Sequence, residues 1–388
     1  MREHQKLPFF TLLLMISFAS VNAVLFTPAL PNIATFFLIP ESIAQQTITW
    51  FLIGYAIGQL FYGPLANRFG RKPAIYTGIM IQILSSLLCV LAGDFHMFHL
   101  LLIGRFLMAL GSGVGLSITF TLVNETYDIS TASKKVSHLL LAFAITPGLG
   151  VALGGVLNTH FGWTSCFYAG AVYGFLLLLL TRRLPETLTT LNVHAFKIKP
   201  LINAYLSQIQ NRTLIMGGLL MGSCTAIIYI FADIVPFIAI DIFQMTSAQY
   251  GFANILPPVG LIAGSLIGAH LINQYALSSI MLMGSWIALA GVIAMLLLIS
   301  LKLPVIVSIF IPVIIIYFGL CFIISNASSL AMRNSTDKAN ASAMMSFINM
   351  GTATLIVLGI SFLKITPMLL PLSYIGLVLF ILLIIRCL

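Results

Sequence analysis

Residues Trp50–Tyr76 read WFLIGYAIGQLFYGPLANRFGRKPAIY and hold the pattern that decides the fold. An apolar run ends in a short segment with three cations, Arg68, Arg71 and Lys72, and a second apolar run then begins. A run of about 20 apolar residues has the length of a membrane-spanning helix. The stretch therefore predicts two membrane-spanning helices joined by a short basic turn.

The composition of the whole chain excludes the main soluble classes of protein. Of its 388 residues, 60% are hydrophobic and only 7% are charged, and the mean hydropathy is +1.09. Soluble domains carry about 25% charged residues. We therefore exclude a soluble enzyme, a nucleic-acid-binding domain and a disulfide-rich secreted module. The five cysteines lie far apart in apolar runs without a CxxC pair, which predicts buried thiols.

Twelve apolar runs are long enough to cross a bilayer, and the chain has no room for a separate soluble domain. The first run resembles a signal peptide ending at Val21-Asn22-Ala23, but we expect it to be retained as a span. The predicted spans are 9–36, 43–66, 72–93, 97–123, 137–159, 163–181, 211–236, 245–271, 278–300, 304–330, 342–363 and 366–386.

The positive charges predict the orientation of these spans. If the N-terminus is cytoplasmic, 15 Lys and Arg residues lie on the cytoplasmic side, only Lys302 and Lys364 lie outside, and Arg105 lies within a span. Such an excess on one side is the usual topology signal of membrane proteins. We expect both termini in the cytoplasm, and the net charge of +9 does not indicate nucleic-acid binding.

The longest polar connection divides the twelve spans into six and six. We predict a first half at 1–181, a cytoplasmic linker at 182–210 and a second half at 211–388. Glycines four residues apart recur in the second span (Gly54, Gly58) and in the eighth (Gly260, Gly264, Gly268), which suggests an internal duplication. The predicted fold class is an all-α integral membrane protein with two pseudo-symmetric six-helix halves around a site near the middle of the membrane.

The basic turn resembles the loop 2–3 signature of the major facilitator superfamily. Six positions match it: Gly63, Leu65, Arg68, Gly70, Arg71 and Lys72. We expect Gly63 to allow close packing of the helix end and Gly70 to permit a tight turn. The resemblance implies a secondary transporter with a cytoplasmic gate at this turn.

Further motifs resemble the bicyclomycin- and chloramphenicol-type (Bcr/CflA) drug:proton antiporters of that superfamily. Pro28-Ala29-Leu30-Pro31 lies in the first span, and Leu184-Pro185-Glu186-Thr187-Leu188 follows the sixth. The fifth span holds the four residues that resemble the antiporter motif: Pro147, Gly150, Gly154 and Gly155. Protons and a small-molecule substrate are the partners that this resemblance implies.

The chain departs from the pattern of this family at several charged positions. Asn67 stands where the loop signature has Asp, Val24 stands where this branch has an acid in the first span, and Asn124-Glu125 replaces an Arg-Asp pair. Charges are also lost in the related loop at Gly268–Tyr275. Glu125 is expected to reach Arg68 or Arg71 and form an ionic latch, with a solvated loop acid as the alternative.

Arg105 lies about 15 Å from the nearest predicted loop, at 1.5 Å per helical residue. An arginine near the bilayer centre costs about 2.5–3.5 kcal/mol, so it should face protein or a water-filled cavity. It matches the family's span-four arginine, with Met108 in place of a glutamine. We predict that Arg105 is required for turnover rather than for folding; the alternative is a side chain that reaches the membrane surface.

Asp233 is the one acid that the span prediction places within a membrane span. Desolvation favours the neutral form of a buried acid, which is what a reversible proton carrier needs. With the usual first-span acid absent, Asp233 is the candidate for proton coupling. The alternative is an interfacial residue near the helix end that carries Asp241.

Asn22, Tyr55 and Gln59 are candidate cavity residues, although each could instead form an ordinary helix–helix hydrogen bond. Glycines four residues apart in the fifth and eighth spans are expected to allow close helix approach, and the resemblance implies that these two spans meet between the halves. No ATP-binding or catalytic pattern occurs, and His96 and His99 lack a third ligand, so we expect neither enzyme activity, cofactor nor metal.

The sequence therefore predicts a monomeric transporter in a bacterial inner membrane, embedded in the lipid bilayer, that exports small organic compounds or drugs against proton entry. One alternative is a specific importer or exporter of a metabolite such as a siderophore, or a facilitator without proton coupling. The other, from a different class, is a transport-inactive sensor or scaffold.

Overall fold

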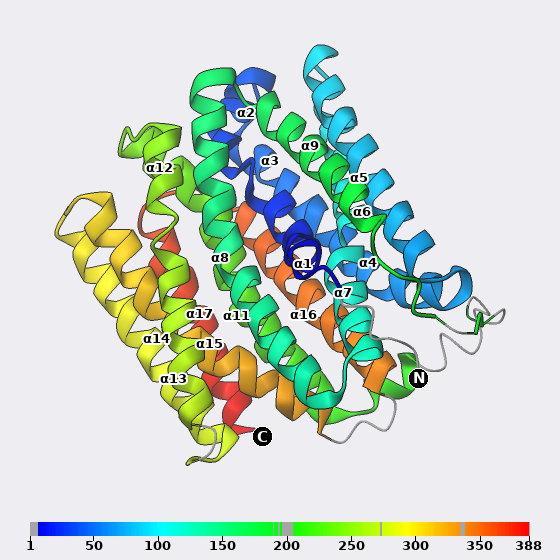
Figure 1. Cartoon of the computed structure of the whole chain (residues 1–388). Helices are drawn as coiled ribbons and strands as arrows, with labels where there is room; N and C mark the ends of the chain where they lie inside the picture. The colour runs from blue at the N-terminus through cyan, green and yellow to red at the C-terminus, as the bar shows by residue number, and fades with distance from the viewer. Residues whose placement is uncertain are drawn as a thin grey trace.

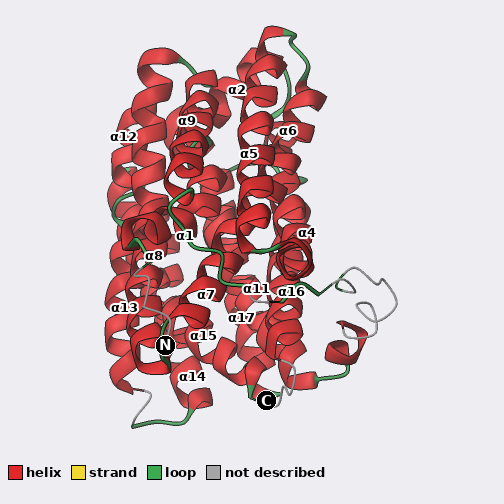
Figure 2. Cartoon of the chain, turned by 45° about the vertical axis from the view of Figure 1, so that its right-hand side comes forward, coloured by secondary structure: helices red, strands yellow, loops and turns green. Residues whose placement is uncertain are grey.

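The computed structural model describes residues 7–188, 190–192, 195, 205–271, 274–333 and 338–387. Residues 189, 193–194 and 196–204 of the predicted linker lie outside this part of the chain, and so do Arg2, Lys6, Lys197 and Lys199, which entered the topology argument. Within the described residues, twelve helical stretches are long and apolar enough to cross a membrane, as predicted. They stand side by side along a common axis (Figure 2).

The first half contains six spans, three of which are interrupted. Its helices are α1 (Phe9–Val24), η1 (Thr27–Ala29) and α2 (Leu30–Phe37); α3 (Glu41–Ala44) and α4 (Gln46–Phe69); α5 (Arg71–Asp94); α6 (Phe98–Ser112) and α7 (Val114–Thr126); α8 (Ile129–Phe161); and α9 (Thr164–Thr181).

The second half contains the other six spans. Its helices are α11 (Arg212–Pro236) and η2 (Phe237–Ile242); α12 (Ser247–Ala253) and α13 (Pro257–Leu271); α14 (Leu277–Ser300); η3 (Ile306–Phe310) and α15 (Ile311–Met332); α16 (Lys338–Ser361); and α17 (Leu369–Arg386).

Prolines account for several of these interruptions. A proline has no N–H group and cannot continue the hydrogen-bond ladder of a helix. Pro28 lies in the short η1 segment between α1 and α2, Pro236 precedes the wide turns of η2, and Pro257 begins α13 after the break that follows α12. Backbone groups freed in this way inside a membrane must find partners within the protein.

The two ends of the bundle differ in how the halves meet. We call the end that carries the α4–α5 turn and the end of α9 the linker end, and the opposite end, which carries α2 and η2, the far end. One buried apolar cluster contains residues of both halves, such as Phe51 and Phe237. At the linker end, Leu122 of the first half and Met345 of the second belong to separate clusters. One buried apolar cluster is therefore shared by both halves, whereas each of the two clusters at the linker end belongs to one half.

The glycine pairs show the internal symmetry that the sequence suggests. A methyl group on Gly54 of α4 would lie 2.2 Å from the carbonyl oxygen of Phe106 in α6. One on Gly260 of α13 would lie 2.1 Å from the carbonyl oxygen of Ile314 in α15. The second span packs on the fourth as the eighth packs on the tenth. The fifth and eighth spans meet between the halves, as expected, because α8 packs on α12 and α13. Gly260, Gly264 and Gly268 permit a different close approach, since all three face α15.

Candidate functional site

Arg105 of α6 is completely buried and binds the backbone of two other spans. Its guanidinium donates to the carbonyl oxygens of Asn22 (2.8 Å), Ala23 (3.1 Å) and Thr47 (3.2 Å). It also lies between two rings, 3.9 Å from the centroid of Phe26 and 4.3 Å from that of Phe51. The side chain therefore does not reach the membrane surface, and it joins the first, second and fourth spans.

The break in the first span explains why those carbonyl groups are open to Arg105. Helix α1 ends at Val24, and the last carbonyl groups of a helix have no partner within it. They also carry the negative end of the helix dipole, which a cation stabilises. Arg105 thus caps the end of α1 with a charged fork, and Phe26 in the break closes over it.

Asn22 also takes part in a second polar contact, on the other side of α1. Its side-chain oxygen accepts a hydrogen bond of 2.9 Å from Gln82 of α5, which is fully buried and also donates to Ser86 and to the carbonyl oxygen of Gly170. Sequence reasoning missed Gln82 because a single glutamine in an apolar span gives no pattern. Asn22 thus faces α5 and serves as a link between spans of the first half.

Tyr55, Gln59 and Tyr229 are polar side chains within the spans of the two halves. Tyr55 and Gln59 lie one turn apart on α4, and both are buried. Tyr229 lies on α11, which packs against η1 of the first half. The amide nitrogen of Gln59 is buried without a geometric hydrogen-bond partner among the described residues.

Asp233 lies one turn beyond Tyr229 on α11 and is only 1% exposed. Neither of its carboxyl oxygens has a hydrogen-bond partner within the described part of the chain. The side chain is therefore inside the protein and not at the interface that the alternative interpretation requires. A buried carboxyl group without partners is costly to maintain, which makes Asp233 a candidate functional residue.

The basic turn at the linker end is built around Arg71. Its side chain donates to Glu125 at the end of α7, at 2.6 Å from Nη2 and 3.3 Å from Nε, which confirms the expected ion pair. Nη1 of Arg71 donates to Asn67 at 2.8 Å. Gly70 has φ = 107°, as the tight turn requires. Asn67 can accept this hydrogen bond as the usual aspartate would, but it adds no charge.

The other residues of the turn behave less uniformly. Glu186, just after α9, accepts hydrogen bonds of 2.9 Å from the backbone N–H groups of Arg71 and Lys72 and so caps α5. The guanidinium of Arg68 lies 5.4 Å from the ring centroid of Phe69. The expectation for Gly63 is wrong, because a methyl group there would meet no heavy atom within 4 Å.

The antiporter motif in α8 lies against both halves at the far end. A methyl group on Gly154 would lie 1.6 Å from the carbonyl oxygen of Leu25, and one on Gly155 would lie 2.3 Å from that of Ser247 in α12. Gly150 lies on the Gly154 side, near Val21, and Pro147 lies inside the helix. These glycines therefore permit backbone-to-backbone packing on the first span and across the halves (Figure 1).

Asn158, one turn further along α8, joins the halves by hydrogen bonds. Its side-chain nitrogen lies 2.9 Å from the side-chain oxygens of Asn32 and Ser247, and Ser247 donates to the carbonyl oxygen of Pro28 at 3.1 Å. No pattern in the sequence singles out Asn158. Its role depends on three elements that meet only in the folded chain.

Comparison with known proteins agrees with this architecture. The D-xylose–proton symporter has the same fold, with a TM-score of 0.75, 14% sequence identity and 96% of each chain covered. An uncharacterized transporter of Rickettsia felis is 28% identical over 69% of this chain and 65% of its own length.

Two relatives have names that refer to drug resistance. The chloramphenicol resistance protein CraA of Acinetobacter baumannii is 26% identical over 70% of this chain and 65% of its own. The multidrug resistance protein MdtL of Escherichia coli is 29% identical over 57% and 55%. The sequence profile of the Major Facilitator Superfamily matches residues 12–360. With the twelve-span fold and the Arg71 turn, this match shows that the chain is a multi-pass membrane protein that belongs to the major facilitator superfamily.

Proposed function

We propose that this transporter exports small organic compounds across a bacterial inner membrane in exchange for protons, with Asp233 as the proton-carrying group. The names of the relatives CraA and MdtL support drug-like substrates. The antiporter motif and its packing in α8 support antiport over uptake. In this proposal the linker end faces the cytoplasm, as the positive charges predict.

The observation that carries the proposal is the state of the Asp233 carboxyl group. It is buried, and no ion pair or hydrogen bond within the described residues holds it in one charge state. A proton carrier needs this freedom, since a permanent cationic partner would compete with the proton. The guanidinium of Arg105 is already bound to carbonyl groups and rings. We therefore assign Arg105 a positioning role and Asp233 the proton.

The energy available fits such an exchange. One proton that crosses a potential of about 100 mV gains about 2.3 kcal/mol. At about 1.4 kcal/mol per factor of ten, this supports roughly a fiftyfold gradient of a neutral solute. A single carrier group such as Asp233 is therefore sufficient for useful export.

The test compares driven and downhill transport in proteoliposomes. An efflux-deficient strain that carries the gene is first grown on a panel of toxicants, with chloramphenicol included, to choose a substrate. Asp233→Asn should abolish accumulation driven by a pH gradient and keep downhill counterflow of the same substrate. Asp94→Asn, which removes an exposed acid at the far end, is the matched control and should transport normally.

Two results would count against the proposal. If Asp233→Asn accumulates substrate with an unchanged pH dependence, Asp233 is not the proton carrier, and a facilitator or another coupling group is favoured. If the wild-type protein shows no flux of any toxicant against which the gene protects cells, export itself is rejected and a sensor or scaffold is favoured.

A further inference from the structure

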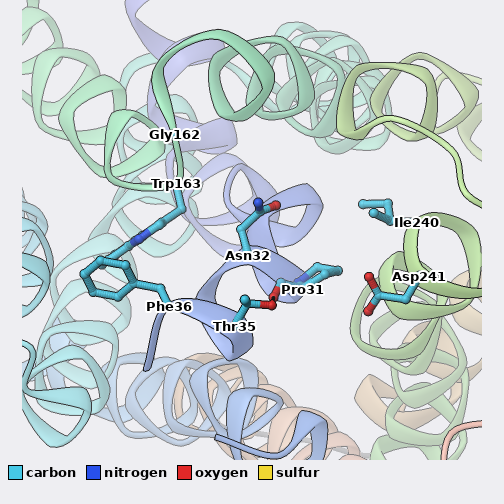
Figure 3. A pocket seen from close by; sticks show the side chains of 8 residues that line it. All are labelled: Pro31, Asn32, Thr35, Phe36, Gly162, Trp163, Ile240 and Asp241. Carbon is cyan, nitrogen blue, oxygen red and sulfur yellow. Dashed lines mark hydrogen bonds between the residues drawn. The ribbon is translucent and has the colours of Figure 1, made fainter. Parts of the chain in front are cut away.

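A cavity of about 370 Å³ lies at the far end, where the two halves meet. It is bounded by α2, by the turn between α8 and α9, and by η2 (Figure 3). This volume is within the range of small-molecule sites. Neither Asp233 nor any residue of the Arg71 turn lines this cavity, so the features described above do not account for it.

One wall of the cavity carries an uncompensated negative charge. Asp241 at the end of η2 directs its carboxylate across the cavity toward Pro31 and Thr35 (Figure 3). Within the described residues, this carboxylate has no ion-pair partner. Glu41 lies within electrostatic range of Asp241 and adds a second negative charge, which Lys364 partly offsets at Glu41. The field at this wall favours a cation.

The opposite wall is aromatic. The rings of Phe36 and Trp163 lie together there, with centroids 5.4 Å apart and planes at 61° (Figure 3). His96 supports this wall from behind, with its ring centroid 4.4 Å from that of Phe36. Aromatic faces attract cations and flat apolar groups.

The space between the walls is edged by neutral polar groups. Asn32 projects into it from α2 (Figure 3), and its side-chain oxygen is held by Asn158 at 2.9 Å. That hydrogen bond orients the side chain and directs its amide nitrogen away from Asn158. The cavity thus offers a carboxylate, an aromatic wall and an orientable polar group from both halves of the protein.

We infer that this cavity binds organic cations that have a flat apolar body, with the positive charge at Asp241 and the body against Phe36 and Trp163. A small inorganic cation would leave the aromatic wall unused, and an anion would face the Asp241 carboxylate. The role of this cavity as an exit site for exported cations rests on the proposed function. The binding site itself does not.

The test uses Trp163 as its own reporter in the full-length protein in lipid nanodiscs. The other two tryptophans are replaced by Trp50→Phe and Trp286→Phe, so that the fluorescence comes from Trp163 alone. The probe is 1-methylnicotinamide chloride, a flat aromatic cation that quenches indole fluorescence. Nicotinamide, its neutral analogue of nearly the same shape, is the control probe.

Saturable quenching by 1-methylnicotinamide, with only collisional quenching by nicotinamide, is the expected result. Asp241→Asn should weaken the apparent affinity for the cation about fivefold, which corresponds to about 1 kcal/mol. Thr35→Arg, which places a positive charge in the cavity, should abolish saturation. Asp94→Asn should leave the titration unchanged, because Asp94 is exposed and does not line the cavity.

Collisional quenching by both probes, or an affinity insensitive to both Asp241→Asn and Thr35→Arg, would overturn the inference. Loss of saturation in Asp233→Asn but not in Asp241→Asn would place the bound cation in the central region instead. A protein that transports nothing but passes the Trp163 test would refute the export proposal and leave this site in place. A protein that transports normally but fails the Trp163 test would refute this binding site and leave the export proposal in place.

Discussion

Replacing Arg105 tests whether a buried cation stabilises this fold. The contacts of its guanidinium predict the direction of the stability change, which the sequence alone does not. The sequence alone predicts that removing Arg105 impairs turnover and leaves folding intact. In the structure its guanidinium bonds three carbonyl groups and contacts two rings. We therefore revise the expectation for Arg105→Met, which keeps much of the volume and removes the charge.

The magnitude follows from the contacts. Hydrogen bonds from a charged donor contribute about 1.5–3 kcal/mol each, and each cation–ring contact contributes about 0.5–2 kcal/mol. Removing the cation recovers about 2.5–3.5 kcal/mol of insertion cost. Even the smallest value for the lost contacts exceeds the largest recovered cost by about 2 kcal/mol. Arg105→Met should therefore destabilise the protein by at least this amount and leave the carbonyl groups of Asn22 and Ala23 unpaired.

The assay measures the thermal unfolding of the protein in detergent. Size-exclusion chromatography of a fluorescent fusion monitors the fraction that remains folded at each temperature. Arg105→Met should lower Tm by several degrees, and Arg105→Lys should lower it less, because an ammonium keeps the charge without the planar fork. Arg183→Met, which removes an exposed cation, should leave Tm unchanged. A wild-type Tm in Arg105→Met would refute the reasoning and restore a role in turnover alone.

Three further predictions follow from other parts of the structure. Gly154→Ala should destabilise the protein by about 1–3 kcal/mol, since its methyl group would overlap the carbonyl oxygen of Leu25; Gly351→Ala, which meets no atom, is the control, and equal Tm values would contradict the packing. Glu125→Gln should cost at most about 1 kcal/mol, because this ion pair is partly exposed, and a larger fall in Tm would show that the pair is effectively buried. A C-terminal alkaline phosphatase fusion should be inactive, and high activity would overturn the assignment of the linker end to the cytoplasm.

Much of the fold could be predicted because the membrane imposes simple rules. Twelve apolar runs of sufficient length became twelve spans, with α9 ending at Thr181 where the sixth run was expected to end. Predictions about residues at one turn, or close to it in the structure, were also confirmed. Gly70 needs a positive φ for the turn between two spans, and Glu125 pairs with a cation of that same turn.

The partners of single polar residues in the spans could not be predicted. Gln82 and Asn158 each bind groups more than 50 positions away in the sequence, and no spacing pattern announces such contacts. The expectation for Gly63 was wrong because the space beside a helix depends on which element packs against it, and no local pattern specifies that element. The aromatic wall and Asp241 were missed as a unit because they come from three separate segments.

The contacts at the two ends show what a transport cycle must change. At the far end, Gly155 packs closely against the backbone of Ser247, and Asn158 and Ser247 form hydrogen bonds between the halves. These contacts must be lost before the halves can separate there. At the linker end, the Arg71–Glu125 pair lies within the first half, so it can persist while the separate apolar clusters come together. Asp233 lies on α11, which also contacts η1 of the first half beside that far-end closure. If Asp233 carries the proton as proposed, its charge changes within the same interface that must open, and this provides a direct physical route from protonation to access.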